Sequence, residues 1–92
     1  MYFLIVIRED DYRVFGASSS YRTLFDIAQY NRGDIFEGGY YGYALITFIE
    51  DTGLYPREVE QQWFTWMCGD EDQTPARICN RPPIDERTYI MY

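Results

Sequence analysis

Carboxylates are the groups in this sequence that are most able to do chemistry. The chain has 92 residues, with fifteen acidic residues against eight basic ones and a formal net charge of −7. Many of the acids stand in short clusters, namely Glu9-Asp10-Asp11, Glu50-Asp51, Glu58 with Glu60, Asp70-Glu71-Asp72 and Asp85-Glu86. Clustered carboxylates can act as acid and base in hydrolysis, hold a cation, or bind basic side chains of a partner.

Catalysis by a side-chain nucleophile lacks its usual partners in this chain. The sequence contains no histidine, and all eight of its basic residues are arginine. The hydroxyls of Ser18, Ser19 and Ser20 and the thiols of Cys68 and Cys79 therefore have no neighbouring His or Lys to activate them. Adjacent carboxylates at the ends of elements are usually solvated surface groups. We therefore expect a protein that is not an enzyme.

Metal and cofactor motifs fail when their spacing is checked. A calcium loop that begins at Asp70 needs glycine at its sixth position, where the sequence has Pro75. Two cysteines without histidine do not complete a zinc site in one chain. The run Gly38-Gly39-Tyr40-Tyr41-Gly42 lacks both the spacing and the lysine of a phosphate-binding loop. The sequence thus predicts no metal and no cofactor.

The acidic balance indicates what kind of partner the chain can bind. Nucleic acid and anionic membranes would repel it, so we expect no direct contact with either. A basic protein or nucleoprotein complex would attract it, and long-range attraction would speed the encounter. Net charge also keeps small proteins soluble, which is the plainer interpretation. Ten tyrosines favour an interface, either with a partner or between two copies in a homodimer, because exposed tyrosine is common at binding surfaces.

We predict that the partner-binding surface combines the acidic clusters with nearby tyrosines. Charge alone gives little binding energy at an exposed surface, and aromatic side chains supply the packing. The predicted binding residues are Glu9, Asp10, Asp11, Tyr40, Tyr43, Glu50, Asp51, Tyr55, Asp70, Glu71 and Asp72.

Strands and one helix are predicted for the first third of the chain. Tyr2–Ile7 is apolar on both faces, as in a strand covered from two sides. A polar turn at Glu9–Asp11 and a returning strand over Tyr12–Ala17 complete a hairpin. One of the serines 18–20 should cap a helix over Tyr21–Arg32, which Gly33 would end. The inner face of this helix is Tyr21, Leu24, Phe25 and Ala28.

The segment from Tyr40 to Met67 holds both tryptophans and is predicted to form two helices joined at Gly53–Pro56. For Tyr40–Asp51 the composition favours a strand, while the glycine that follows favours a helix, and we predict the helix. Its inner line would be Tyr41, Leu45, Phe48 and Thr52, with Ala44 and Ile49 beside it. Pro56–Cys68 is predicted as a helix because Val59, Trp63, Trp66 and Met67 recur at helical spacing.

The predicted fold is therefore α+β. A small antiparallel sheet, made from the N-terminal hairpin and a C-terminal strand over Arg87–Tyr92, would pack against two or three helices. Ala76–Cys79 is predicted as a short additional strand. We expect one domain over residues 1–92 and a cytoplasmic location, because Tyr2–Ile7 is too short for the core of a signal peptide and no apolar stretch is long enough to span a membrane.

The opening hairpin and helix resemble HicB-type antitoxins over about residues 2–30, but Gly16-Ala17-Ser18 stands where that family has a Pro-Gly-Cys turn. No residue's role follows from this resemblance. In size and charge the chain is similar to small acidic inhibitors, such as phage anti-CRISPR and anti-restriction proteins and bacterial immunity proteins. We expect an anti-defence inhibitor that mimics nucleic acid and blocks a host protein's nucleic-acid site. The alternatives are an antitoxin or immunity protein that neutralises a basic toxin, and a structural subunit of a larger complex.

Overall fold

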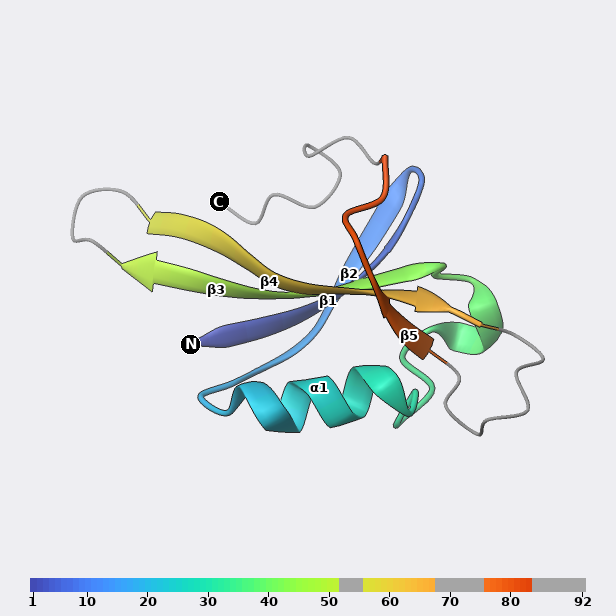
Figure 1. The fold of residues 1–92 in the computed structure, drawn as a ribbon, viewed down its shortest axis with the longest axis horizontal. Helices are drawn as coiled ribbons and strands as arrows, with labels where there is room; N and C mark the ends of the chain where they lie inside the picture. Colours follow the sequence, from blue (N-terminus) through green and yellow to red (C-terminus); the bar gives the residue numbers. More distant parts are fainter. Residues whose placement is uncertain (52–55, 68–75, 84–92) are drawn as a thin grey trace.

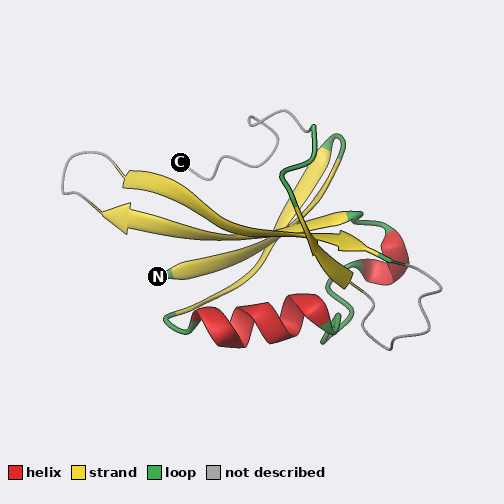
Figure 2. Ribbon diagram, viewed as in Figure 1, coloured by secondary structure: helices red, strands yellow, loops and turns green. Residues whose placement is uncertain are grey.

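The computed structural model describes residues 1–51, 56–67 and 76–83, which form an α+β fold. A five-stranded antiparallel sheet with the order β2-β1-β3-β4-β5 carries one helix on one face (Figures 1 and 2). The elements are β1 (Tyr2–Arg8), β2 (Asp11–Ser18), α1 (Tyr21–Gln29), the 3-10 turn η1 (Glu37–Gly39), β3 (Tyr43–Asp51), β4 (Pro56–Trp66) and β5 (Ala76–Cys79).

The N-terminal hairpin is confirmed. Strands β1 and β2 pair from Arg8–Asp11 at the turn to Tyr2–Ser18 at the far end, with a bulge at Phe15. The apolar run of β1 lies inside the sheet between β2 and β3, and its residues 4–7 are buried. This burial explains the continuous apolar sequence, because a strand covered on both faces needs no polar alternation.

The prediction of two helices between Tyr40 and Cys68 is wrong. The first of these segments is the strand β3 and the second is the strand β4, and they pair as a long antiparallel hairpin. The predicted set of two or three helices is thus one helix and a 3-10 turn. The short strand predicted over Ala76–Cys79 is confirmed as β5, whereas the strand predicted over Arg87–Tyr92 lies outside the described residues.

The helical spacing in β4 arose from burial on both sides of the sheet. Trp63 and Phe64 are adjacent in the strand and point to opposite faces, yet both are buried. A bulge at Gln61, opposite the step from Ile46 to Thr47, shifts the alternation further. The sequence pattern therefore contained no strict two-residue period. The predicted core position Met67 is also wrong, because its side chain is 37% exposed.

Both ends of α1 are capped by side chains or backbone of its own flanks. Ser20 accepts a hydrogen bond from the Thr23 N–H at 3.3 Å, so the predicted serine cap is confirmed. The helix ends at Gln29, before the predicted Arg32. Asn31 takes the left-handed position after it (φ 49°), with Asn31 N–H bonded to Ala28 and Arg32 N–H to Ile27. These two backbone hydrogen bonds form a Schellman motif, which ends the helix with Asn31, rather than the predicted Gly33, in the left-handed position.

The sheet has an apolar core on each face. The first face, covered by α1, holds the larger cluster, which comprises Leu4, Val6, Leu24, Ala28, Ile35, Phe36, Tyr41, Ala44, Ile46, Phe64 and Ala76. On the second face Ile5, Ile7, Leu45 and Trp63 form a smaller cluster. The predicted inner face of α1 is confirmed, with Leu24 and Ala28 buried and Tyr21 and Phe25 packed beside them. Among the residues described, no helix has the length and apolar character to cross a membrane.

Candidate acidic binding site

Two turns meet at one end of the sheet and bring acidic residues together. The β1–β2 turn carries Glu9 and Asp10, and Asp11 begins β2 directly after it. The chain between α1 and β3 contributes Glu37 and Tyr40 at the same end. The pairing of Ile7 with Tyr43 sets this juxtaposition, because it places the end of β1 beside the start of β3. All five residues are exposed. We call Glu9, Asp10, Asp11, Glu37 and Tyr40 the acidic end.

Arg8 ties the two turns of the acidic end together. Its guanidinium Nε lies 3.5 Å from Asp10 Oδ1, and its Cζ lies 4.3 Å from the centroid of the Tyr40 ring. A hydrogen bond with the Tyr40 side chain raises the pKa of Arg8 above its ordinary value, and the carboxylates of Asp10 and Asp11 raise it further. Arg8 therefore stays charged and holds Tyr40 over the end of β1.

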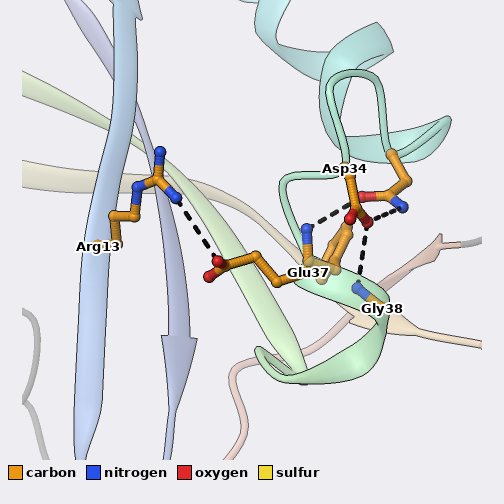
Figure 3. Close-up of polar contacts among 6 residues, drawn as sticks. Arg13, Asp34, Glu37 and Gly38 are labelled. Carbon is orange, nitrogen blue, oxygen red and sulfur yellow. Dashed lines mark hydrogen bonds and ion pairs between the residues drawn. The ribbon is translucent and has the colours of Figure 1, made fainter.

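A network of side-chain hydrogen bonds shapes the chain between α1 and η1 (Figure 3). Asn31 Oδ1 accepts the Phe36 N–H at 3.0 Å, and Asn31 Nδ2 donates to Asp34 Oδ1 at 3.2 Å. The same Asp34 oxygen accepts the Gly38 N–H at 3.1 Å. Backbone groups that would otherwise point to solvent are thereby paired within the segment.

Glu37 is held in a strained backbone conformation. Its φ is 50°, in the left-handed region, and the φ angles of Asn31 and Asp34 are close to this value. Asparagine and aspartate tolerate left-handed backbone better than glutamate does. A left-handed residue of this kind costs about 1–3 kcal/mol, so its surroundings must stabilise it. Arg13 Nη1 on β2 lies 3.9 Å from Glu37 Oε1, and Figure 3 shows the two side chains pointing toward each other.

Close packing against Trp66 anchors η1 to the sheet. A Cβ placed on Gly39 would lie 2.9 Å from the Trp66 indole nitrogen, and Gly39 has a φ of +100°. The ring of Phe36 packs on Trp66 with centroids 5.4 Å apart. Glycine is therefore required at position 39, and the contact determines where the next residue, Tyr40, leaves the turn.

Tyr41 sits beneath the acidic end and responds to its charge. Burial raises the pKa of the Tyr41 hydroxyl, and the carboxylates of Asp11 and Glu37 raise it further. The Tyr40 and Tyr41 rings meet edge to face with centroids 4.9 Å apart. The carboxylates of Asp11 and Glu37 therefore both favour the protonated form of this phenol.

Several predicted binding residues lie away from the acidic end. Tyr43 lies at the same end of the sheet, paired with Ile7, but its side chain is half-buried on the second face. Glu50 is exposed near the opposite end of β3, roughly 23 Å along the strand from Tyr43 at ~3.3 Å per residue. Asp51 is the last residue of β3. The predicted binding residues Tyr55, Asp70, Glu71 and Asp72 lie outside the described residues.

The described residues offer groups that bind positive charge rather than a reactive thiol or a set of metal ligands. Burial raises the pKa of the Cys79 thiol, which keeps it protonated and a poor nucleophile. In residues 1–51, 56–67 and 76–83, no group of three or more His, Cys, Asp or Glu side chains is arranged to hold a metal ion. What the acidic end presents is a set of hydrogen-bond acceptors beside an exposed aromatic ring, which suits arginine or lysine side chains.

Glu37 is absent from the predicted binding residues because it stands alone between Phe36 and Gly38 and belongs to none of the acidic clusters in the sequence. The signal was present in the alternation of asparagine, aspartate and glycine, the residues that adopt left-handed backbone most readily. Such a run indicates an ordered turn that presents whatever stands within it. Comparison with protein-family models, curated proteins and solved structures finds no match to this chain.

Proposed function

We propose that the chain is a non-enzymatic binding protein that places its acidic end in the nucleic-acid site of a basic host protein. It acts as an inhibitor of the anti-defence type, with carboxylates in place of the phosphates that the host protein otherwise binds. The proposal needs no cofactor and no metal. Its partner is a basic protein or nucleoprotein complex.

The observation that carries the proposal is the convergence of carboxylates from two separate turns around an exposed tyrosine. Asp10 reaches Tyr40 through Arg8, and Glu37 joins them from η1. Tyr40 is 51% exposed, although it is a large aromatic residue. An exposed aromatic ring with carboxylates in the adjoining turns provides both the packing and the charge that a tight interface with a basic surface needs.

Two arginines beside the acidic end partly neutralise its charge and orient its side chains. Arg8 and Arg13 each pair with a carboxylate, at 3.5 Å and 3.9 Å. Exposed pairs of this type contribute little to stability, so a partner's arginine can compete for the same oxygens at small cost. Held side chains also lose less conformational entropy when a partner binds.

The test has two steps. Proteins retained by the immobilised chain at low ionic strength are identified, purified, and assayed for nucleic-acid binding with and without the chain. The proposal expects competition with nucleic acid that weakens steeply as salt is added, because exposed charges are screened. Binding that leaves the partner's nucleic-acid affinity unchanged, or that does not respond to salt, would contradict it.

Charge reversal supplies the matched control. Asp10→Arg changes the acidic end, whereas Glu50→Arg makes the same change in net charge near the other end of β3. We expect Asp10→Arg to abolish competition and Glu50→Arg to leave most of it. Equal losses in the two variants would mean that net charge, rather than the acidic end, determines binding.

A further inference from the structure

Within residues 1–51, 56–67 and 76–83, the outer edge of β2 is an open edge of the sheet next to the acidic end. Strand β2 stands last in the order β2-β1-β3-β4-β5, and among the residues described it pairs with β1 alone. Its residues Asp11–Val14 are exposed on both faces. The other edge strand, β5, has only four residues and is followed by Pro82 and Pro83. Of the two edges, β2 offers the longer pairing surface.

One hydrogen bond shows which backbone groups of β2 face outward. The Tyr12 N–H donates to Asp11 Oδ1 at 2.8 Å, so it is bonded to a side chain on the free side of the strand. Backbone groups alternate sides along a strand, so the N–H and C=O of Val14 face the same way as those of Tyr12. The bulge at Phe15 ends the regular stretch. The open edge is therefore the segment Asp11–Val14.

The devices that usually protect an edge strand are weak here. Natural edges are often protected by proline, by lysine or other charged side chains, and by bulges. This segment has no proline or lysine, its charges are Asp11 and Arg13, and the bulge at Phe15 lies just beyond it. Tyr12 is 38% exposed and Val14 is 40% exposed. Their register partners, Ile7 and Ile5, place them on the second face, at the margin of its core. A strand added here would extend that apolar surface.

The charge around the edge selects its occupant. Glu9, Asp10 and Asp11 stand at one end of the segment, and Glu37 reaches Arg13 from the first face. Two antiparallel copies centred near the turn would bring these acids together, while a strand bearing arginine or lysine would meet opposite charge. We infer that β2 accepts an extended basic segment of the partner as a sixth strand, an inference that rests on the proposed function.

In this arrangement the partner's backbone bonds to Val14 and Tyr12. A cationic side chain draws the Asp11 carboxylate away from the Tyr12 N–H, which then pairs with the added strand. Backbone pairing supplies affinity and the flanking acids supply the preference for basic sequences, as in other cases of strand addition.

The test uses a blocked peptide of alternating arginine and valine, titrated into the isotopically labelled protein. We expect shifts and slowed hydrogen exchange for the Tyr12 and Val14 amides, and loss of binding for Val14→Pro, which removes a donor that β1 does not use. The same peptide with N-methyl groups on alternate residues keeps its charge but blocks pairing, so it should also lose binding even if Val14→Pro perturbs the edge.

The outcomes separate this inference from the proposed function. If Val14→Pro and the N-methylated peptide bind as well as their parents while Asp10→Arg binds poorly, the charge has a role but strand addition is wrong. No binding of the parent peptide at millimolar concentration also overturns strand addition, and the competition assay still decides the function. Self-association of the free protein that is lost in Val14→Pro would show that the edge takes a second copy instead.

Discussion

The guanidinium of Arg8 lies 4.3 Å from the centre of the Tyr40 ring and joins the last residue of β1 to the turn before β3. The two residues are far apart in sequence, and the antiparallel pairing of β1 with β3 brings them together. The same guanidinium contacts Asp10, so one cation orients both an acid and an aromatic residue of the acidic end. This pair is the place to test whether the geometry of the acidic end affects stability and binding.

Replacement of Tyr40 by alanine should remove the stacking on Arg8. A cation stacked on an exposed ring contributes modestly to stability, so the free energy of unfolding in urea should fall slightly. Tyr40→Phe keeps the ring and loses only the hydroxyl contact with Arg8, so its free energy of unfolding should fall by less than that of Tyr40→Ala. Equal losses in the two variants would assign the stabilisation to the hydroxyl alone. Partner competition should weaken in Tyr40→Ala.

Alanine at position 39 should force η1 away from Trp66. The added Cβ would lie 2.9 Å from the indole nitrogen, in a backbone conformation that alanine rarely adopts. Overpacking and the positive φ together predict a loss of about 2–4 kcal/mol in the free energy of unfolding. Gly38→Ala has a positive φ but open space, so it isolates the backbone contribution, and Gly16→Ala has neither strain nor a neighbour within 4 Å. If Gly38→Ala and Gly39→Ala lose the same free energy of unfolding, the contact with Trp66 does not contribute and the positive φ alone explains the loss.

Asn31 has two roles that a pair of variants can separate. Its backbone is left-handed after α1, and its side chain bonds to Phe36 and Asp34. Asn31→Ala should lose both contributions and about 1–3 kcal/mol of stability. Asn31→Gly keeps the backbone freedom and loses only the side-chain bonds, so thermal unfolding should rank it between the wild type and the alanine variant. A glycine variant as unstable as the alanine variant would mean that the side-chain bonds determine the effect.

Stability should decline at alkaline pH because of Tyr41. The pKa of this phenol is raised above the ordinary value of 10.0, so above that pH the unfolded chain releases its proton while the folded chain keeps it. The contribution is fully present below pH 10.0 and is lost as pH rises through the folded pKa. Tyr41→Phe cannot ionise, so its free energy of unfolding should fall less steeply across this range. Tyr12→Phe, on the exposed edge strand, is the control, and an identical slope in Tyr41→Phe and wild type would contradict the prediction.

The helix cap gives a direct test of local structure. Ser20→Ala removes the acceptor for the Thr23 N–H and should cost about 1 kcal/mol. Ser19 precedes it and makes no cap bond in the described structure, so Ser19→Ala should stay within about 0.5 kcal/mol of wild type. Urea unfolding of the two variants makes the comparison. A larger loss in Ser19→Ala would place the cap one residue earlier.

Sequence reasoning succeeded where neighbours in the chain determine the structure. The hairpin of β1 and β2, the cap at Ser20 and the inner face of α1 depend on residues within a few positions of each other. It failed for β3 and β4, because glycine at position 53 and proline at position 56 match, in sequence, the end of one helix and the start of the next. Their aromatic and β-branched residues pair within a sheet that is buried on both faces. Because both faces are apolar, these strands lack the alternation of apolar and polar residues that would identify them in the sequence.

The sequence by itself determined that the chain is acidic, rich in tyrosine, and without the histidine and lysine that most side-chain catalysis uses. It also located the β1–β2 turn at Glu9 and Asp10, because turn preference is a local property, although the predicted third turn residue, Asp11, begins β2. Only the tertiary structure decided that Asp10 and Tyr40 meet through Arg8, that Glu37 joins them, and that Glu50 lies elsewhere. Strand pairing and a left-handed turn set those positions, and both depend on contacts between residues that are distant in the chain.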